Sequence, residues 1–248
     1  MSTYVAAIPA ASRLPGRRYD RVFFPIMAGL ILASVFIGFA KTYYLAGLIH
    51  APLPSWIIHV HGAIFSSWII LLMVQIGLVS ARRVDLHRKL GLAGFGLACL
   101  MVVFGLLAAQ NALGRGFSPL AGVSPGTFFI VPVTDIVVFA ILIYFGYTLR
   151  SDSAAHKRIM MIATLGILDA AIARWPFALI QTGPHFVADA CLYAFFVLLA
   201  GYDLWSTHKI HRATLWGSLF VIVVQQVRIP IALTHLWLRF ADMALGKF

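Results

Sequence analysis

The chain has 248 residues, of which 61% are hydrophobic and only 11% are charged, and its mean hydropathy is +0.92. Soluble domains carry about 25% charged residues, so this composition excludes an ordinary soluble domain. The net charge is +11, with 19 Lys and Arg residues against eight acids, all of which are Asp. A basic chain can indicate nucleic-acid binding, but these basic residues cluster between apolar stretches, which argues against nucleic acid as a partner.

Seven apolar stretches are long enough for transmembrane helices, which need about 20 residues each. In chain order they cover residues 22–40, 55–79, 91–112, 128–149, 157–175, 186–205 and 213–238. They predict an all-α, polytopic membrane protein with a single seven-helix transmembrane domain over residues 21–248. Residues 1–20 are predicted to form a flexible cytoplasmic tail.

The basic residues fall mainly before the first stretch and then in every second gap. They are Arg13, Arg17, Arg18 and Arg21, then Arg82, Arg83, Arg88 and Lys89, then Arg150, Lys157 and Arg158, and finally Lys209 and Arg212. Loops rich in Lys and Arg stay on the cytoplasmic side of a membrane. The pattern therefore predicts a cytoplasmic N-terminus and a C-terminus outside.

On this topology, polar residues inside the predicted helices gather in the outer half of the bundle. His61, Trp68 and Gln75 follow helical spacing and share one face of the second stretch, whereas His59 points elsewhere. The other polar residues of this half that we expect to bind a ligand are Asp135, Asp169, Arg174, Gln226 and Arg228. Charged side chains at membrane depth are costly and usually mark function or pair with one another. We therefore expect Asp135 to lie within ion-pair reach of Arg174 or Arg228.

Three functions are compatible with these residues. In the first, an outward-facing polar pocket binds a small ligand or ion. In the second, the protein is a membrane enzyme that uses a divalent metal held by His61, Asp135 and Asp169, or a haem for which His235 would supply the second axial ligand. In the third, the charges are structural ion pairs and the protein is an auxiliary subunit of a larger membrane complex. Besides the lipid bilayer, the expected partners are a small solute, an ion or other membrane subunits.

Short motifs recur at the predicted cytoplasmic corners, as His87-Arg88-Lys89-Leu90-Gly91 and His156-Lys157-Arg158-Ile159-Met160. With His61-Gly62 and the segment Arg174-Trp175-Pro176, they make residues 20–240 resemble a group of bacterial multi-pass membrane proteins that have no assigned function. The resemblance implies a location in the bacterial inner membrane and implies no reaction.

Overall fold

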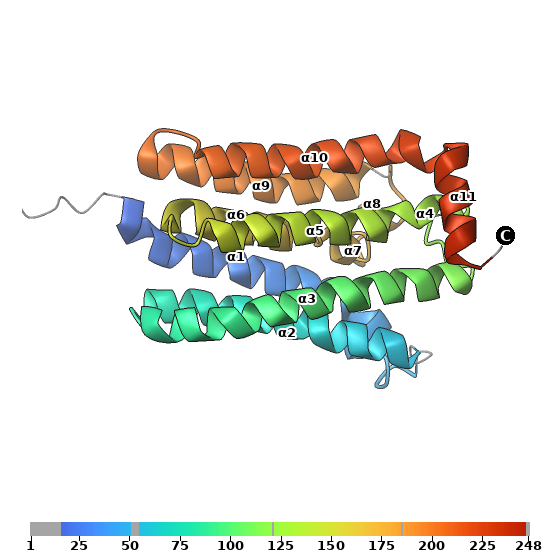
Figure 1. Cartoon of the computed structure of the whole chain (residues 1–248), viewed down its shortest axis with the longest axis horizontal. Helices are drawn as coiled ribbons and strands as arrows, with labels where there is room; N and C mark the ends of the chain where they lie inside the picture. The colour runs from blue at the N-terminus through green and yellow to red at the C-terminus, as the bar shows by residue number, and fades with distance from the viewer. Residues whose placement is uncertain (1–15, 51–54, 121, 185, 247–248) are drawn as a thin grey trace, which may run out of the picture.

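The computed structural model describes residues 16–50, 55–120, 122–184 and 186–246, which form helices joined by turns, without a strand among them. The longest helices are α1 (Gly16–Phe39), α2 (Trp56–Ser80), α3 (Val84–Gly114), α5 (Ile130–Thr148), α9 (Phe186–Thr207) and α10 (Arg212–Ala232). The shorter ones are the π-helix η1 (Ala40–Tyr44), α4 (Pro125–Phe128), α6 (Ser153–Leu165), α7 (Asp169–Ile172), α8 (Ala178–Gln181) and α11 (His235–Ala244). The long helices run side by side in one elongated bundle (Figure 1).

Within the described residues, six helical stretches are long and apolar enough to cross a membrane. They are Tyr19–Tyr44, Trp56–Ser80, Val84–Gly114, Pro125–Thr148, Phe186–Thr207 and Arg212–Ala232. Large apolar side chains such as Ile70, Leu92 and Val197 point out of the bundle and are exposed. A water-soluble protein would not expose apolar surface on this scale. The protein is therefore a polytopic helical membrane protein.

The fifth predicted stretch, 157–175, is not one long helix. It forms α6, then a break at residues 166–168, and then the single turn of α7. Most residues of α6 are buried, including Arg158 and Thr164. Because α6 is covered by other helices, it can be short and can carry polar side chains that a lipid-facing helix could not.

The seventh predicted stretch, 213–238, also differs from the structure. Helix α10 ends at Ala232, after Pro230, and Thr234 caps a new helix by accepting a hydrogen bond from the Trp237 amide (3.3 Å). This helix, α11, lies across the end of the bundle (Figure 1). Arg228 of α10 therefore lies on a different helix from His235 and Arg239 of α11.

The predicted N-terminal tail lies largely outside the described residues, but α1 begins at Gly16, so residues 16–20 are helical. The third predicted helix begins at Val84 and not at residue 91. The connections α2–α3, α5–α6 and α9–α10 lie together at one end of the bundle (Figure 1). We call it the basic end, since its corners carry Arg82, Arg150 and Lys209.

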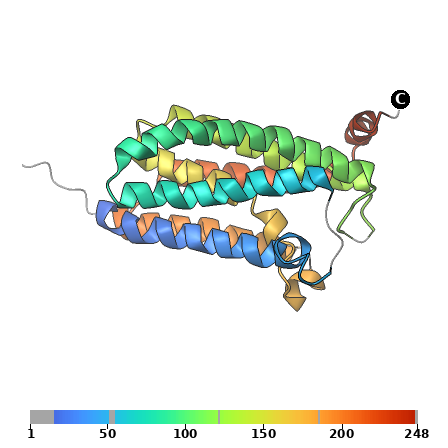
Figure 2. The ribbon, with the colours of Figure 1, turned by 90° about the horizontal axis from the view of Figure 1, so that it is seen from below.

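Helix α1 packs closely against α7. A Cβ atom added to Gly38 would overlap the backbone of Ala171, and in particular its carbonyl oxygen. Seen from below, α1, α2 and α3 lie side by side, with α7 and α8 beside the end of α1 (Figure 2). This close approach helps to place Asp169, the first residue of α7, inside the bundle.

Candidate functional site

Three charged side chains meet in the half of the bundle opposite the basic end. Arg228 of α10 donates through Nη1 to Asp135 Oδ1 (2.5 Å) and through Nη2 to Asp169 Oδ2 (3.1 Å). Its Nη1 also lies 3.4 Å from the Thr134 hydroxyl. Asp135 and Arg228 are only 8% and 9% exposed. We call Arg228, Asp135 and Asp169 the Arg228 cluster.

Each charge of the Arg228 cluster comes from a different element. Asp135 lies in the second turn of α5, Arg228 one turn before the end of α10, and Asp169 at the start of α7. Asp169 Oδ1 accepts a hydrogen bond from the Ala170 amide (2.6 Å), which leaves Oδ2 for the guanidinium. The break after α6 thus turns a carboxylate towards α10. The prediction that Asp135 pairs with Arg174 or Arg228 is confirmed, and the partner is Arg228.

The charges within this cluster do not cancel if both acids are ionised. Two carboxyl groups bond to one guanidinium, and they are near enough to each other to interact electrostatically. Like charges at one site disfavour each other's ionised form. A single proton bound between Asp135 and Asp169 would neutralise the cluster.

Arg174 lies beside the Arg228 cluster and bonds elsewhere. Its guanidinium donates to the Ala170 carbonyl (2.5 Å) and lies 5.1 Å from the centre of the Phe39 ring. It is near enough to Asp169 to interact with it electrostatically. Arg174 therefore sits at the margin of the site that the sequence predicted it to line.

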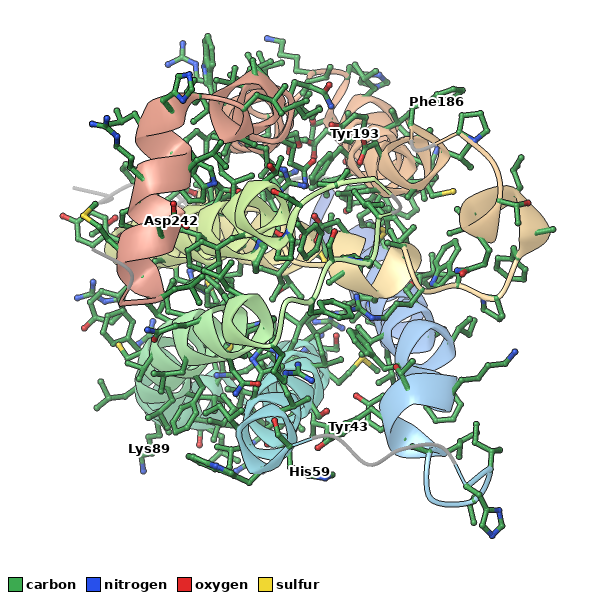
Figure 3. All side chains as sticks on the ribbon, turned by 90° about the vertical axis from the view of Figure 1, so that its right-hand side faces the viewer. Tyr43, His59, Lys89, Phe186, Tyr193 and Asp242 are labelled. Carbon is green, nitrogen blue, oxygen red and sulfur yellow. The ribbon has the colours of Figure 1, made fainter. Side chains whose placement is uncertain are left out.

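Gln226 also lies at this margin. Its amide nitrogen donates to the Tyr193 hydroxyl (2.7 Å), linking α10 to α9. Figure 3, drawn from the end opposite the basic end, shows Tyr193 between these two helices. Tyr193 was not predicted as a site residue, although it lies on the same face of α9 as Asp189, one helical turn away.

The predicted face of the second stretch exists, but it does not line the Arg228 cluster. His61 stacks on Phe65 (4.1 Å between ring centres) and lies near the Phe104 backbone, while its Nδ1 atom has no partner among the described residues. Trp68 is buried and donates to the Thr164 hydroxyl (3.1 Å). Gln75 lies farther along α2 towards the basic end, against Gly91 of α3. These side chains pack helices together.

The proposed metal ligands do not assemble. Within the described part of the chain, no three His, Cys, Asp or Glu side chains are placed to hold a metal ion, so His61, Asp135 and Asp169 do not form the expected set. His235, the second axial ligand expected for a haem, is an exposed residue at the start of α11. His59 is exposed and lies beside Tyr43 (Figure 3), whereas His61 stacks on Phe65.

A second charge cluster, at the basic end, was not predicted. Asp203 of α9 is fully buried and accepts hydrogen bonds from the Arg158 guanidinium, from the Thr214 hydroxyl (2.5 Å) and from the His211 amide (3.0 Å). We call Arg158, Asp203 and Thr214 the Arg158 cluster. In the sequence, an Asp precedes each His-containing connection at the basic end. This pattern could have drawn attention to Asp203, but it did not indicate that the Arg158 side chain turns into the bundle.

A comparison of the chain with protein-family models, curated proteins and solved structures found no match. The geometry of the two charge clusters is therefore the basis for a functional proposal.

Proposed function

We propose that this membrane protein binds a proton between Asp135 and Asp169, held against Arg228, as the ion-binding centre of a transport or signalling function. The supporting observation is that two carboxyl groups share one guanidinium inside the bundle. An unpaired charge at this depth costs several kcal/mol or is removed by protonation. Carboxyl groups in such surroundings are the usual proton carriers of membrane proteins.

A proton suits the centre better than a larger ligand does. The two outer nitrogens of Arg228 are already bonded to carboxylates, so an anionic solute would have to displace one of them. A divalent metal would need further ligands, and His61 is engaged on the α2–α3 side. We therefore narrow the expected small ligand or ion to a proton.

We also propose the expected topology, with seven crossings, a cytoplasmic N-terminus and the bacterial inner membrane as the location. Helix α5 ends at the basic end and α9 begins at the opposite end (Figure 1), so the interrupted segment α6–α7 carries the fifth crossing. The basic corners at one end support this orientation. The Arg228 cluster then lies in the outer half of the membrane.

Infrared spectroscopy of the protein in membranes tests the proton. The chain has no Glu, so side-chain carboxylic acid bands arise only from its eight Asp residues. At neutral pH the wild type should show such a band. Asp135→Asn and Asp169→Asn should each remove it, because the remaining acid then ionises beside Arg228. Asp242→Asn, which changes an exposed residue of α11, is the matched control and should leave the band unchanged.

The second candidate is an auxiliary subunit in which both charge clusters are structural. The observation that favours it is the Arg158 cluster, where Asp203 is saturated with hydrogen bonds and ties α6, α9 and α10 together. In that case Asp135 and Asp169 are both ionised at neutral pH, no carboxylic acid band is found, and the protein co-purifies with other membrane subunits.

A further inference from the structure

Helix α10 carries a row of polar side chains on its buried face, and this row runs from one charge cluster to the other. Its members are Thr214, Ser218, Gln225 and Arg228, which are 1%, 8%, 4% and 9% exposed. Their spacing keeps them on one side of the helix. At 1.5 Å per residue the row is about 21 Å long, most of the roughly 30 Å hydrocarbon core. We call these four residues the α10 row.

The ends of the α10 row are well bonded, whereas its middle is not. Thr214 donates to Asp203, and Arg228 donates to Asp135 and Asp169. In contrast, the Ser218 hydroxyl and both polar atoms of the Gln225 amide are buried without a hydrogen-bond partner among the described residues.

Unpaired buried polar groups are expensive. Each costs about 1–3 kcal/mol, and in native proteins nearly all of them bond to protein or to ordered water. Ser218 and Gln225 lie about two helical turns apart, with Val221 between them on the same face. A few water molecules beside Val221 would satisfy all three atoms and join them into one chain of hydrogen bonds.

Polar groups extend the row at the end opposite the basic end. Tyr193 accepts a hydrogen bond from Gln226, and it lies near enough to Asp169 and Asp189 for electrostatic interaction. Asp189 is in the first turn of α9, at the end of the bundle that faces the viewer in Figure 3. A hydroxyl and a carboxyl group therefore lie between the Arg228 cluster and this surface.

At the basic end, His211 links the Arg158 cluster to the surface. Its amide donates to Asp203, and its Nδ1 accepts a hydrogen bond from the Ala213 amide (3.1 Å). The side chain lines an open groove of about 830 Å³ together with Lys209 and Arg212. Burial, reinforced by the nearby Arg158 charge, lowers the pKa of His211.

From this arrangement we infer that the α10 row holds a file of water that conducts protons between the Arg228 cluster and the Arg158 cluster. This inference rests on the proposed function, since it gives the proton of Asp135 and Asp169 a route across the bundle. In each step one O–H bond breaks as the next forms. At the basic end, water in the open groove beside His211 takes up the proton that leaves, one for each proton that enters at the opposite face, and no group is changed.

Proton flux into liposomes tests the inference. The purified protein is reconstituted into liposomes that enclose a pH-sensitive dye. A potassium gradient with valinomycin sets the membrane potential. The wild type should acidify the lumen well above protein-free liposomes. Gln225→Met keeps the side-chain length but removes the hydrogen-bonding groups. It should lower the flux by about tenfold or more, since a barrier higher by about 1.4 kcal/mol slows a step tenfold.

Matched substitutions away from the row control for general damage. Gln110→Met changes an exposed glutamine whose amide donates to the Ala244 carbonyl, and Ser67→Ala changes an exposed serine of α2. Both should retain wild-type flux, whereas Ser218→Ala should lower it. Ser218→Ala also keeps the inference testable should Gln225→Met fail to fold.

Two outcomes overturn the inference and leave the proposed proton site intact. The first is wild-type flux equal to that of protein-free liposomes while the carboxylic acid band of Asp135 and Asp169 persists. The second is unchanged flux in folded Gln225→Met and Ser218→Ala. Loss of the infrared band from the wild type itself would instead reject the proposed function, on which the inference rests.

Discussion

Among single residues, Arg228 is the one on which the site depends. It bonds to both carboxyl groups, so each acid keeps a bonded cation only while the guanidinium is present. Because an unpaired charge at membrane depth is unfavourable, the sequence alone predicted that Asp135 would be paired. It could not select Arg228 over Arg174, because that choice depends on how α7 and α10 are rotated in the bundle. The face of His61, Trp68 and Gln75 was likewise predictable, but its neighbours were not.

Replacement of Arg228 should therefore be the most damaging change in the cluster. Arg228→Met leaves two buried carboxyl groups without a cation and should lower the free energy of unfolding by about 3–5 kcal/mol. Asp135→Asn preserves a neutral Arg228–Asp169 pair and should cost about 1–3 kcal/mol. Denaturant unfolding in detergent measures both, with the exposed Arg239→Met of α11 as control. Equal losses for Arg228→Met and Arg239→Met would contradict the pairing.

Among the elements, the interrupted segment α6–α7 and the end of α10 are where the observed helices differ from the predicted transmembrane stretches. Hydropathy identifies helices that face lipid, because lipid contact requires a long apolar surface. It fails for α6, which neighbouring helices cover and which ends at Leu165. It also runs past Ala232, because Leu233 and Leu236 are apolar although Thr234 caps a new helix. Pro230 followed by Thr234 was the sequence pattern that could have indicated the end of one helix and the start of the next.

The position of α7 should depend on the close approach of α1. Gly38→Val places side-chain atoms where the Ala171 carbonyl lies, and backbone cannot move aside as a flexible side chain could. We expect a loss of about 1–3 kcal/mol from the forced shift. Gly29→Val, on the same helix with open space around it, is the control and should be nearly neutral. Thermal unfolding of the two variants compares them, and similar melting temperatures would argue against tight α1–α7 packing.

For the whole molecule, composition and charge distribution predict the class of protein but not the buried charge clusters. Composition and the apolar stretches were sufficient to predict a polytopic helical membrane protein, and six helices of the right length and composition in the described part of the chain confirm it. The Arg158 cluster was hidden because Arg158 belongs to the same basic corner as Lys157, and a charge pattern does not reveal which side chain turns inward.

Reporter fusions test the proposed orientation. Fusions after residues 85, 153 and 209 should all report the cytoplasm, because these corners carry the clustered Lys and Arg residues. A fusion after residue 117, in the connection between α3 and α4, should report the outside. An external signal from any of the first three fusions, or a cytoplasmic signal from the fusion after residue 117, would contradict the seven-crossing topology.

Solid-state NMR of wild-type protein in lipid membranes, with ¹³C in the Asp side-chain carboxyl groups, reads the protonation state of the Arg228 cluster. The chain has only eight Asp residues and no Glu, so few resonances need assignment. At neutral pH we expect one shared acid proton, seen as a protonated carboxyl resonance correlated with its neighbour and assigned to Asp135 and Asp169. Carboxylate resonances for all eight residues would contradict the proton-binding centre.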